Sequence, residues 1–579
     1  MRYVCVDKEN KLLEVKNLSV AFGGRTVVEN LSYRLERGRT LGIVGESGSG
    51  KSVSTLALMG LLPKQATVTG SAFLSQSEQK KLSESSDGSD CIKNINLLTL
   101  DEEGFRSIRG KRISMIFQEP MTSLNPVQRC GDQVVEMMKA HPNSKFRIQN
   151  SELKQRVLSL FTEVLLPRPE KIFDAYPHEL SGGQKQRVMI AMALVNNPDI
   201  LIADEPTTAL DVTVQKTILE LLRELQQKHG TSIIFITHDL GVISQVADDI
   251  LVMYRGKVVE QGPAEQILRQ PQQPYTQGLL ACRPPLDSKP RRLPTVDEYL
   301  GEGVPPCTPD NVPPCTPVQI HNSKLIEVRD LSVLYTLKRS LFGRPLQTLK
   351  GVDDVTFDIL EGETLGLVGE SGCGKTTLGR ALLRLIEHQS GSISYRGRSL
   401  DSLSAKEMRA LRPKLQIIFQ DPYSSLNPRI TVGEAISEPL RVHGHAERSR
   451  TLELMEQVGL KADWYSRYPH ELSGGQRQRV CIARALILQP ELVICDESVS
   501  ALDVSVQAQV LNLLNDLKEQ YHYTYLFITH DLSVVHYMAD RIMVMQKGKV
   551  VESGTPDDLF HHPQTAYTRT LIEAIPRID

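Results

Sequence analysis

The sequence predicts an α/β protein in which two similar domains follow one another, each with a mixed, largely parallel sheet as its core and a helical subdomain beside it. Three observations support this prediction. A glycine-rich loop occurs twice, 324 positions apart, each time between an apolar strand and an apolar helix. The other apolar runs are short and lack alternation, which suits parallel strands covered on both faces. Short motifs recur in the same order in both halves of the 579-residue chain, a length that favours more than one domain.

The first half shows the expected order of elements. Residues 40–44 form a short apolar strand that enters the glycine-rich loop, and residues 53–62 form an apolar helix that leaves it. Residues 200–203 and 233–236 are further buried strands. This alternation of strand, loop and helix is typical of a sheet whose parallel strands are joined by helices.

The spacing of the repeated motifs locates the differences between the halves. From Ser181, Asp204 and His238 to their counterparts the offset is always 292 residues, so the second part of each half aligns without a gap. The first half carries 22 extra residues before Gln118. We place them in the polar stretch 75–90, which has the composition of a solvated loop.

A proline-rich stretch separates the two halves. Residues 284–317 contain 10 prolines, which exclude a helix or an inner strand and indicate a semi-rigid linker. We therefore expect a first domain at residues 1–284, a linker at 285–322 and a second domain at 323–579.

Each glycine-rich loop has the composition of a phosphate-binding P-loop, in which glycines let backbone N–H groups curl around phosphate oxygens at the start of a helix. Lys51 and Lys375 would reach the β- and γ-phosphates, and Ser52 and Thr376 would each place a hydroxyl on Mg²⁺. One such match could be a chance turn, but two in the same setting argue against chance. The predicted nucleotide-binding residues are Gly45, Glu46, Ser47, Gly48, Ser49, Gly50, Lys51, Ser52, Gly369, Glu370, Ser371, Gly372, Cys373, Gly374, Lys375, Thr376 and Thr377.

An Asp-Glu pair ends an apolar strand in each half. Asp204 and Asp496 stand where a carboxylate holds Mg²⁺, directly or through water. The adjacent Glu205 and Glu497 are placed to polarise the attacking water. Such a pair alone could be a solvated turn, but after a P-loop at this separation we interpret it as catalytic.

The motif Leu-Ser-Gly-Gly-Gln occurs once in each half, before a helical stretch. Its serine stands where a helix N-cap belongs, and its glycines leave backbone N–H groups accessible. A glycine-rich turn before a helix is common, yet a second anion site suggests that one domain's motif closes on the other's nucleotide. The residues are Ser181, Gly182, Gly183, Gln184, Ser473, Gly474, Gly475 and Gln476.

In this order the motifs resemble the nucleotide-binding domains of ABC transporters, which are P-loop NTPases, and the resemblance covers both halves. It implies that ATP on each P-loop faces the signature motif of the other half in a head-to-tail pairing. It also implies that His238 and His530 contact the γ-phosphate, and that Gln118 and Gln420 bind Mg²⁺ and couple it, with water, to a transmembrane partner.

An aromatic residue before each P-loop of this family usually stacks on adenine. Phe22 is the candidate in the first half. Tyr335 is the weaker candidate in the second half, because an insertion around residues 338–346 displaces it.

A finer resemblance joins the chain to the branch that imports dipeptides, oligopeptides, glutathione or nickel complexes, and in particular to fused, glutathione-type ATPases. It rests on the segments after Gln118 and Gln420 and on Pro274-Tyr-Thr-Gln-Gly-Leu-Leu and Tyr567-Thr-Arg-Thr-Leu. The resemblance implies a peripheral ATPase on the cytoplasmic face of the inner membrane. Its implied partners are two transmembrane permease subunits and an extracytoplasmic solute-binding protein.

Two departures from the repeat fall within the sites. Ser498 replaces the proline that follows Asp-Glu in the first half, Pro206, so the geometry of the second turn is in question. Cys373 replaces Ser49 in the second P-loop, where the backbone does the binding, and could be an oxidation-sensitive thiol beside the nucleotide.

The nine cysteines are scattered, and reduced thiols are expected. Some peptide-importer ATPases hold an iron–sulfur cluster on C-terminal cysteines. The corresponding region of this chain contains Cys282, Cys307 and Cys315. This chain has no close set of four cysteines there, so we favour plain linker cysteines.

The composition argues against other classes of protein. Lys plus Arg, 67, balance Asp plus Glu, 69, so we expect no nucleic-acid partner. No apolar run approaches the roughly 18 residues of a spanning helix, and the first residues lack a signal-peptide core, so a cytosolic chain is expected. Three other classes of ABC protein carry features that this sequence does not predict. A tandem ABC protein acting on ribosomes usually has a long charged linker, and a chromosome ATPase has coiled coils or zinc modules. An exporter usually has its own membrane domain. An importer of nickel or another small solute remains open.

Overall fold

The computed structural model describes residues 10–75, 94–118, 123–141, 150–208, 210–301, 321–339, 345–444, 447–500 and 502–578. The loop expected at residues 75–90 lies outside this part from residue 76 onward, as do Cys307 and Cys315. By their contacts the residues divide into two units. The first comprises Met1–Leu210, Val214–Leu280 and Pro576–Asp579, and the second comprises Asp211–Thr213 and Ala281–Ile575.

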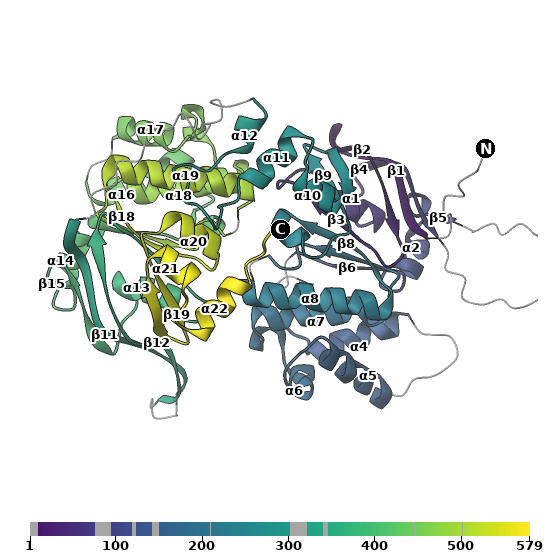
Figure 1. Ribbon diagram of the computed structural model, residues 1–579, viewed down its shortest axis with the longest axis horizontal. Coiled ribbons are helices and arrows are strands. Elements are labelled where there is room, and N and C mark those ends of the chain that lie inside the picture. The colour runs from purple at the N-terminus through teal and green to yellow at the C-terminus, as the bar shows by residue number, and fades with distance from the viewer. Residues whose placement is uncertain are drawn as a thin grey trace, which may run out of the picture. The chain divides into compact units, whose positions relative to one another are not determined.

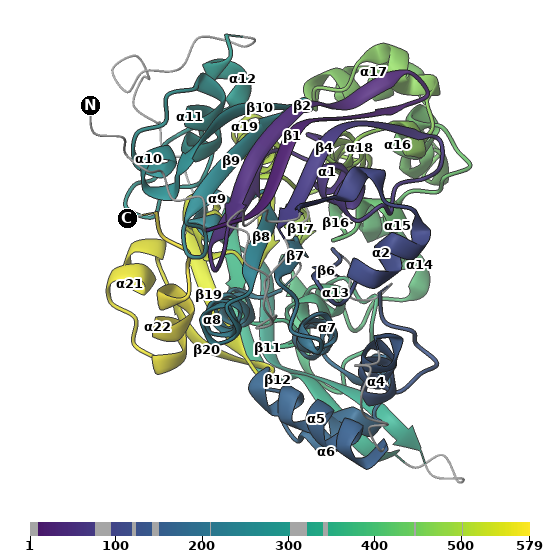
Figure 2. The ribbon, with the colours of Figure 1, turned by 90° about the vertical axis from the view of Figure 1, so that its right-hand side faces the viewer.

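The first unit contains an antiparallel sheet with the strand order β2-β1-β4-β5 and a larger sheet with the order β10-β9-β3-β8-β7-β6 (Figure 1). In the larger sheet β3 pairs in parallel with β8 and β9, and only β10 runs antiparallel to its neighbour. Figure 2 shows β9, β8, β7 and β6 of this sheet. The strands are β1 Lys11–Phe22, β2 Arg25–Glu36, β3 Thr40–Val44, β4 Ala66–Ser75, β5 Asn94–Asn96, β6 Ile113–Ile116, β7 Ile200–Asp204, β8 Ser232–Thr237, β9 Asp249–Tyr254 and β10 Lys257–Pro263.

The helices of the first unit lie around its larger sheet and in the segment between β6 and β7. That segment contains α4 to α7 and corresponds to the helical subdomain predicted from the sequence. The helices are α1 Lys51–Leu58, α2 Glu102–Ile108, α4 Cys130–Ala140, α5 Asn150–Glu163, α6 Pro169–Asp174, α7 Gly182–Leu194, α8 Val212–His229, α9 Leu240–Ile243, α10 Ala264–Arg269 and α11 Pro274–Ala281.

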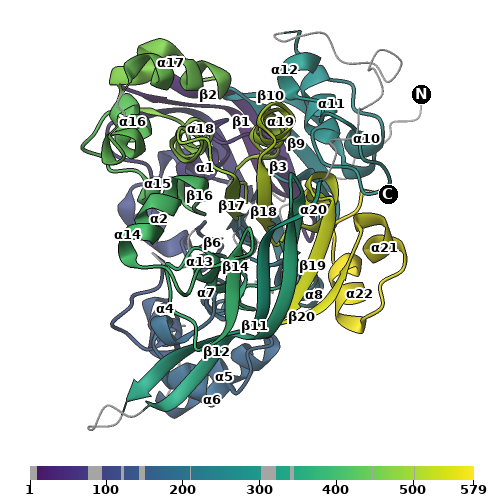
Figure 3. The ribbon, with the colours of Figure 1, turned by 90° about the vertical axis from the view of Figure 1, so that its left-hand side faces the viewer.

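The second unit repeats this architecture, with sheets ordered β12-β11-β14-β15 and β16-β17-β18-β13-β19-β20 (Figure 3). Its strands are β11 His321–Arg339, β12 Pro345–Glu361, β13 Thr364–Val368, β14 Ser390–Tyr395, β15 Arg398–Ser399, β16 Leu415–Ile418, β17 Leu492–Asp496, β18 Thr524–Ile528, β19 Arg541–Gln546 and β20 Lys549–Gly554. Its helices are α12 Val296–Tyr299, α13 Lys375–Leu382, α14 Ala405–Leu411, α15 Pro422–Ser425, α16 Val432–Val442, α17 Arg448–Gln457, α18 Gly474–Leu486, α19 Val504–Tyr521, α20 Leu532–Met538, α21 Pro556–His561 and α22 Ala566–Glu573.

The buried central strands explain the apolar runs of the sequence. Every residue of β3, β7 and β8 is buried, and the same holds for β13, β17 and β18. Because these strands are covered on both faces, their sequences do not alternate. The predicted strand 40–44 is confirmed, and the helix predicted at 53–62 is α1, which begins earlier because Gly50 is its N-cap and ends with Met59 as C-cap.

The proline-rich stretch after residue 284 packs onto the second unit over its first part. The N–H of Leu293 donates to Asn512 Oδ1 at 2.9 Å, and Asn512 Nδ2 donates back to the Leu293 carbonyl at 2.8 Å. The expectation that this stretch contains no helix is wrong for one turn, α12, where residues 295–299 lack proline and Thr295 forms a capping box with Glu298. The domain limits expected from the sequence stay a prediction.

Within the described ranges, no helix combines the length and the apolar character needed to cross a bilayer.

Candidate functional site: two P-loop centres

Each P-loop joins the end of a central strand to the start of a helix. Gly45 has φ +152°, and a Cβ on it would lie 2.2 Å from the carbonyl oxygen of Met253 in the adjacent strand β9. Gly369 repeats this geometry, with φ +151° and the same 2.2 Å approach to the carbonyl of Met545. Only glycine fits at this point, so the first glycine sets how the loop leaves the sheet.

A buried lysine closes each loop. Lys51 Nζ donates to the carbonyl oxygens of Gly45 and Glu46 at 2.7 and 2.9 Å. Lys375 Nζ makes the equivalent bonds at 2.6 and 3.0 Å. Both side chains are about 95% buried, so each ammonium is fixed within the loop where a phosphate would be received.

A hydroxyl and a carboxylate meet beside each P-loop. Ser52 Oγ donates to Asp204 Oδ1 at 2.9 Å, and Thr376 Oγ1 donates to Asp496 Oδ1 at 2.8 Å. Burial raises the pKa of Asp204 to about 6, despite the hydrogen bond from Ser52, and burial also raises the pKa of Asp496. A buried carboxylate with this shift is an oxygen donor that a divalent cation would stabilise, and the adjacent hydroxyl is a second one, so the pair fits Mg²⁺.

Glu205 follows Asp204 and is the centre of a small polar cluster. Gln118 Nε2 donates to Glu205 Oε2 at 3.0 Å, Thr208 Oγ1 donates to the same oxygen at 2.9 Å, and His238 Nδ1 lies 3.4 Å from Oε1. Burial would raise the pKa of Glu205, but His238, together with Thr208 and Lys51, outweighs it and lowers the pKa to about 2. Glu205 is therefore an ionised, oriented acceptor at neutral pH.

Glu497 has a related but different environment. Gln420 Nε2 donates to Glu497 Oε2 at 2.7 Å, His530 Nδ1 lies 3.5 Å from that oxygen, and Lys375 Nζ is 3.9 Å from Oε1. Burial would raise the pKa of Glu497, but His530 and Lys375 outweigh it and lower it. Ser500 Oγ donates to the backbone carbonyl of Glu497 at 2.9 Å, not to its carboxylate.

The backbone at both glutamates is unusual. Glu205 has φ +47° and Glu497 has φ +49°, a left-handed conformation that is uncommon for a residue with a side chain. The N–H of Glu205 donates to the Ile236 carbonyl at 2.9 Å, and that of Glu497 donates to the Ile528 carbonyl at 2.9 Å. The sheet thus holds each glutamate in a conformation that costs energy, as is common at functional sites.

The two signature motifs begin helices α7 and α18, as expected. Ser181 is the N-cap of α7 and forms a capping box with Gln184, and Ser473 does the same with Gln476. A Cβ on Gly183 would lie 2.8 Å from Val214 Cγ1, so this glycine allows the motif to pack closely against α8. The serines are exposed, and the helix start therefore presents its N–H groups at the surface.

The two aromatic candidates lie in different settings. Phe22 ends β1 and packs, partly buried, against the core of the first unit. Tyr335 is 40% exposed, and its hydroxyl lies 3.2 Å from Oγ1 of Thr377, the residue that follows the second P-loop. Adenine stacking stays a prediction for both.

The two departures from the repeat are accommodated in the core. Cys373 is 7% exposed, and burial raises the pKa of its thiol, which argues against the expected oxidation-sensitive thiol. Ser498 is buried at 3% exposure, and Glu497 keeps the left-handed backbone of Glu205 without the proline. Cys282 is fully buried.

Sequence reasoning missed three contacts to these centres. Thr208 was not singled out, although a hydroxyl three residues after the glutamate can reach its carboxylate. Tyr275 and Tyr567 belong to the segments that resemble the peptide-importer branch, and each hydroxyl accepts a hydrogen bond from a P-loop N–H. The signal was their offset of 292 residues, the same as that of Ser181, Asp204 and His238 from their counterparts.

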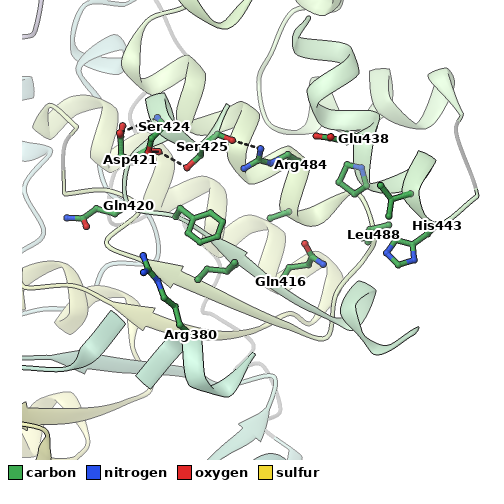
Figure 4. A pocket seen from close by; sticks show the side chains of 15 residues that line it. Arg380, Gln416, Gln420, Asp421, Ser424, Ser425, Glu438, His443, Arg484 and Leu488 are labelled. Atoms are coloured by element: carbon green, nitrogen blue, oxygen red, sulfur yellow. Dashed lines mark hydrogen bonds between the residues drawn. The ribbon is translucent and has the colours of Figure 1, made fainter. Parts of the chain in front are cut away.

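A groove of about 740 Å³ lies beside Gln420 in the second unit (Figure 4). Gln420 lies at one end of it, and His443 and Glu438 lie toward the other. Arg484 Nη1 donates to the Ser425 carbonyl at 2.5 Å and holds the short helix α15 at the groove wall. The groove is lined by both charged and apolar side chains, the latter including Ile417, Phe419 and Val442.

Comparisons with known proteins agree with this geometry. Residues 28–208 and 352–500 match the ABC transporter family, and residues 259–302 and 551–579 match the family described as oligopeptide/dipeptide transporter, C-terminal region. The chain is 47% identical to the glutathione import ATP-binding protein GsiA of Salmonella paratyphi A, over 98% of this chain and 90% of the relative. It is 46% identical to the proteins of the same name from Pectobacterium atrosepticum, over 99% and 90%, and from Escherichia coli K12, over 98% and 89%.

Among solved structures, the dimeric post-hydrolysis state of the ATP-binding cassette MJ0796 with ADP and phosphate is 26% identical, with a TM-score of 0.36, and covers 40% of this chain and 98% of that one. The matches in both halves and the curated relatives establish the family. The chain belongs to the ABC transporter family and is an ATPase with two nucleotide-binding domains in one polypeptide.

Proposed function

We propose that this ATPase energises the import of peptides, either dipeptides and oligopeptides or glutathione-like molecules, through an ABC permease in the inner membrane. The observation that carries the proposal is the oligopeptide/dipeptide transporter C-terminal region, which matches once in each half of the chain, at residues 259–302 and 551–579. The 47% identity to a glutathione import ATP-binding protein supports the same class of substrate.

The P-loop residues would bind the phosphates of ATP. Backbone N–H groups between Gly45 and Ser52 receive the phosphate oxygens, and Lys51 contributes a fixed positive charge. Ser52 and Asp204 in the first site, and Thr376 and Asp496 in the second, would hold Mg²⁺. When bound, the cation neutralises charge that develops on the transferred phosphoryl group.

The glutamates would orient the attacking water. Glu205 and Glu497 are ionised at neutral pH, so each can accept a hydrogen bond from water on the γ-phosphate side. His238 and His530 hold the carboxylates at 3.4 and 3.5 Å and would contact the γ-phosphate. An ionised Glu205 would polarise and position the water that attacks the γ-phosphate.

The signature motifs would complete the sites in a head-to-tail pairing. Each starts a helix whose N-terminus favours an anion, which supports a role as a second phosphate contact. In this arrangement Ser181 serves the nucleotide of the second P-loop and Ser473 serves that of the first. ATP binding would close the two domains, and hydrolysis would release them.

The permease partners would dock beside the glutamines. The groove next to Gln420 offers apolar side chains such as Phe419 and Val442, which suits a short helix of a transmembrane subunit. Gln420 donates a hydrogen bond to Glu497, so a partner bound in the groove can change the orientation of the catalytic carboxylate. We infer two permease subunits, a peripheral position on the cytoplasmic face and an extracytoplasmic solute-binding protein that delivers the substrate.

Uptake measurements test the substrate class. Deletion of the gene for this chain should abolish uptake of labelled glutathione or of labelled di- and oligopeptides, and the wild-type gene should restore it. The variant Glu205→Gln plus Glu497→Gln, expressed to the same level, should not restore it. Unchanged uptake of all peptides with lost uptake of nickel would favour the alternative importer, and co-sedimentation with ribosomes without any uptake defect would favour the ribosomal ATPase.

A further inference from the structure

Residues 259–302 and 551–579, the regions matched as transporter C-terminal regions, are called the C-terminal extensions of the two domains. A tyrosine from the extension of the first domain contacts the first P-loop. Tyr275 lies in α11, is 2% exposed, and its hydroxyl accepts a hydrogen bond from the backbone N–H of Glu46 at 3.2 Å. Its ring packs at a tilt of 34° against that of Tyr254, with 4.3 Å between ring centroids. The phenol is therefore held against the second residue of the loop, 229 positions away in sequence.

The second domain contains the same contact. The Tyr567 hydroxyl accepts from the backbone N–H of Glu370 at 3.1 Å. Tyr567 lies in α22, which packs with α21 near β19 and β20 (Figures 1 and 3). Because the arrangement occurs twice at the constant offset of 292 residues, it is a feature of the domain and not an accident of one surface.

Each tyrosine is positioned by a carboxylate on the preceding strand. Glu260 accepts from the N–H groups of Gln272 and Gln273 at 2.7 and 3.3 Å, in the turn that leads into α11. Glu552 does the same for the turn before α22, accepting from the N–H groups of Gln564 and Thr565 at 2.7 and 3.0 Å. Each extension is thus anchored at the turn that precedes the helix with its tyrosine.

The hairpin that carries these strands also holds the P-loop. The N–H of Gly256 donates to the Ser49 carbonyl at 3.1 Å, and the N–H of Gly548 donates to the Cys373 carbonyl at 2.8 Å. The loop therefore has one anchor at its second residue, from the tyrosine, and another at its fifth. The residues between them include Gly48, which is exposed and has φ +81°.

We propose that Tyr275 and Tyr567 are positioning residues for ATP binding, and that the C-terminal extensions serve to hold the P-loops in their phosphate-binding conformation. The hydroxyl accepts a hydrogen bond from an N–H at the start of the loop and so orders the loop before the nucleotide binds. Nucleotide binding therefore costs less conformational entropy. The inference rests on the nucleotide site of the proposed function. It adds a role for the extension that concerns nucleotide affinity rather than the transported substrate.

Conservative variants of the full chain test this role. Tyr275→Phe and Tyr567→Phe keep the ring and remove only the hydroxyl. Each should weaken one of the two binding sites for a fluorescent ADP analogue by about 5- to 10-fold, the factor that corresponds to one hydrogen bond. The double variant should weaken both sites and raise the KM for ATP by a similar factor, with kcat within about twofold of wild type.

A matched control separates positioning from general stability. Tyr525→Phe removes a buried hydroxyl that donates to the Leu514 carbonyl at 3.2 Å, without contact to a P-loop, and should leave ADP affinity unchanged. Unchanged ADP affinity in the double variant would overturn the proposal. So would a loss of kcat at constant KM, because a smaller folded fraction gives that pattern. ADP affinity does not depend on hydrolysis, so failure of the proposed catalytic glutamates would not be confused with failure of this inference.

Discussion

Thr208 and Ser500 occupy equivalent positions but contact different parts of the neighbouring glutamate. Thr208 Oγ1 donates to the carboxylate of Glu205 at 2.9 Å, whereas Ser500 Oγ donates to the backbone carbonyl of Glu497 at 2.9 Å. A hydrogen bond to a charged group contributes about 1.5 to 3 kcal/mol. Removal of the Thr208 hydroxyl leaves the buried carboxylate with one fewer donor to fix its orientation toward water.

The variant Thr208→Ala should therefore slow the first site selectively. At about 1.4 kcal/mol per tenfold, the low end of that range gives about a 10-fold loss in the turnover of the first site. Steady-state ATP hydrolysis by the whole chain should then fall to about half of wild type if the sites act independently, and lower if they are coupled.

The matched variant Ser500→Ala provides the comparison in the same assay. It should keep hydrolysis near the wild-type rate, because the Glu497 carboxylate keeps its contacts with Gln420 and His530. Phosphate release measured at saturating ATP separates the two variants. Equal losses in both, or no loss in Thr208→Ala, would refute the distinction between carboxylate and carbonyl contacts.

Three further outcomes are expected from single substitutions. Gly369→Ala should abolish nucleotide binding at the second site in an equilibrium titration, because its Cβ would lie 2.2 Å from the Met545 carbonyl. Burial would raise the pKa of Glu491, but hydrogen bonds led by that from Lys414 outweigh it and lower the pKa to about 2. This stabilisation is present above the unfolded pKa and is lost as pH falls, so Glu491→Gln should lower the Tm at pH 7, with a difference from wild type that shrinks below about pH 4.5. Cys373 should react with iodoacetamide at least about 10-fold more slowly than an exposed cysteine, as read by mass spectrometry of its peptide, and rapid labelling of the folded chain would contradict its burial.

Much of each centre could be predicted because the chemistry depends on short, contiguous motifs. The P-loop needs glycine where Gly45 approaches a neighbouring strand, and the Asp-Glu pair needs the end of a buried strand to present its carboxylates. Because those constraints are local, they appear in the sequence as recognisable short motifs. The constant offset of 292 residues then predicts that both halves fold alike.

The features that could not be predicted depend on contacts between segments distant in sequence, or on short stretches that differ in composition from their surroundings. The hydrogen bond from the Glu46 N–H to the Tyr275 hydroxyl joins residues 229 positions apart, and no local sequence pattern predicts it. The turn α12 forms inside a proline-rich stretch because residues 295–299 happen to lack proline and carry a capping box. Packing of Leu293 against Asn512 likewise follows from tertiary structure and not from the composition of the linker.

We propose that two competent centres hydrolyse ATP through Glu205 and Glu497. ATP binding and hydrolysis by the double variant Glu205→Gln plus Glu497→Gln test it most directly, because the substitution keeps the shape of each side chain and removes its charge. The variant should still bind two nucleotides per chain and should lose at least about 100-fold in turnover, as expected for removal of a group that positions the nucleophile. Two bound nucleotides with wild-type hydrolysis would contradict the assignment of both glutamates.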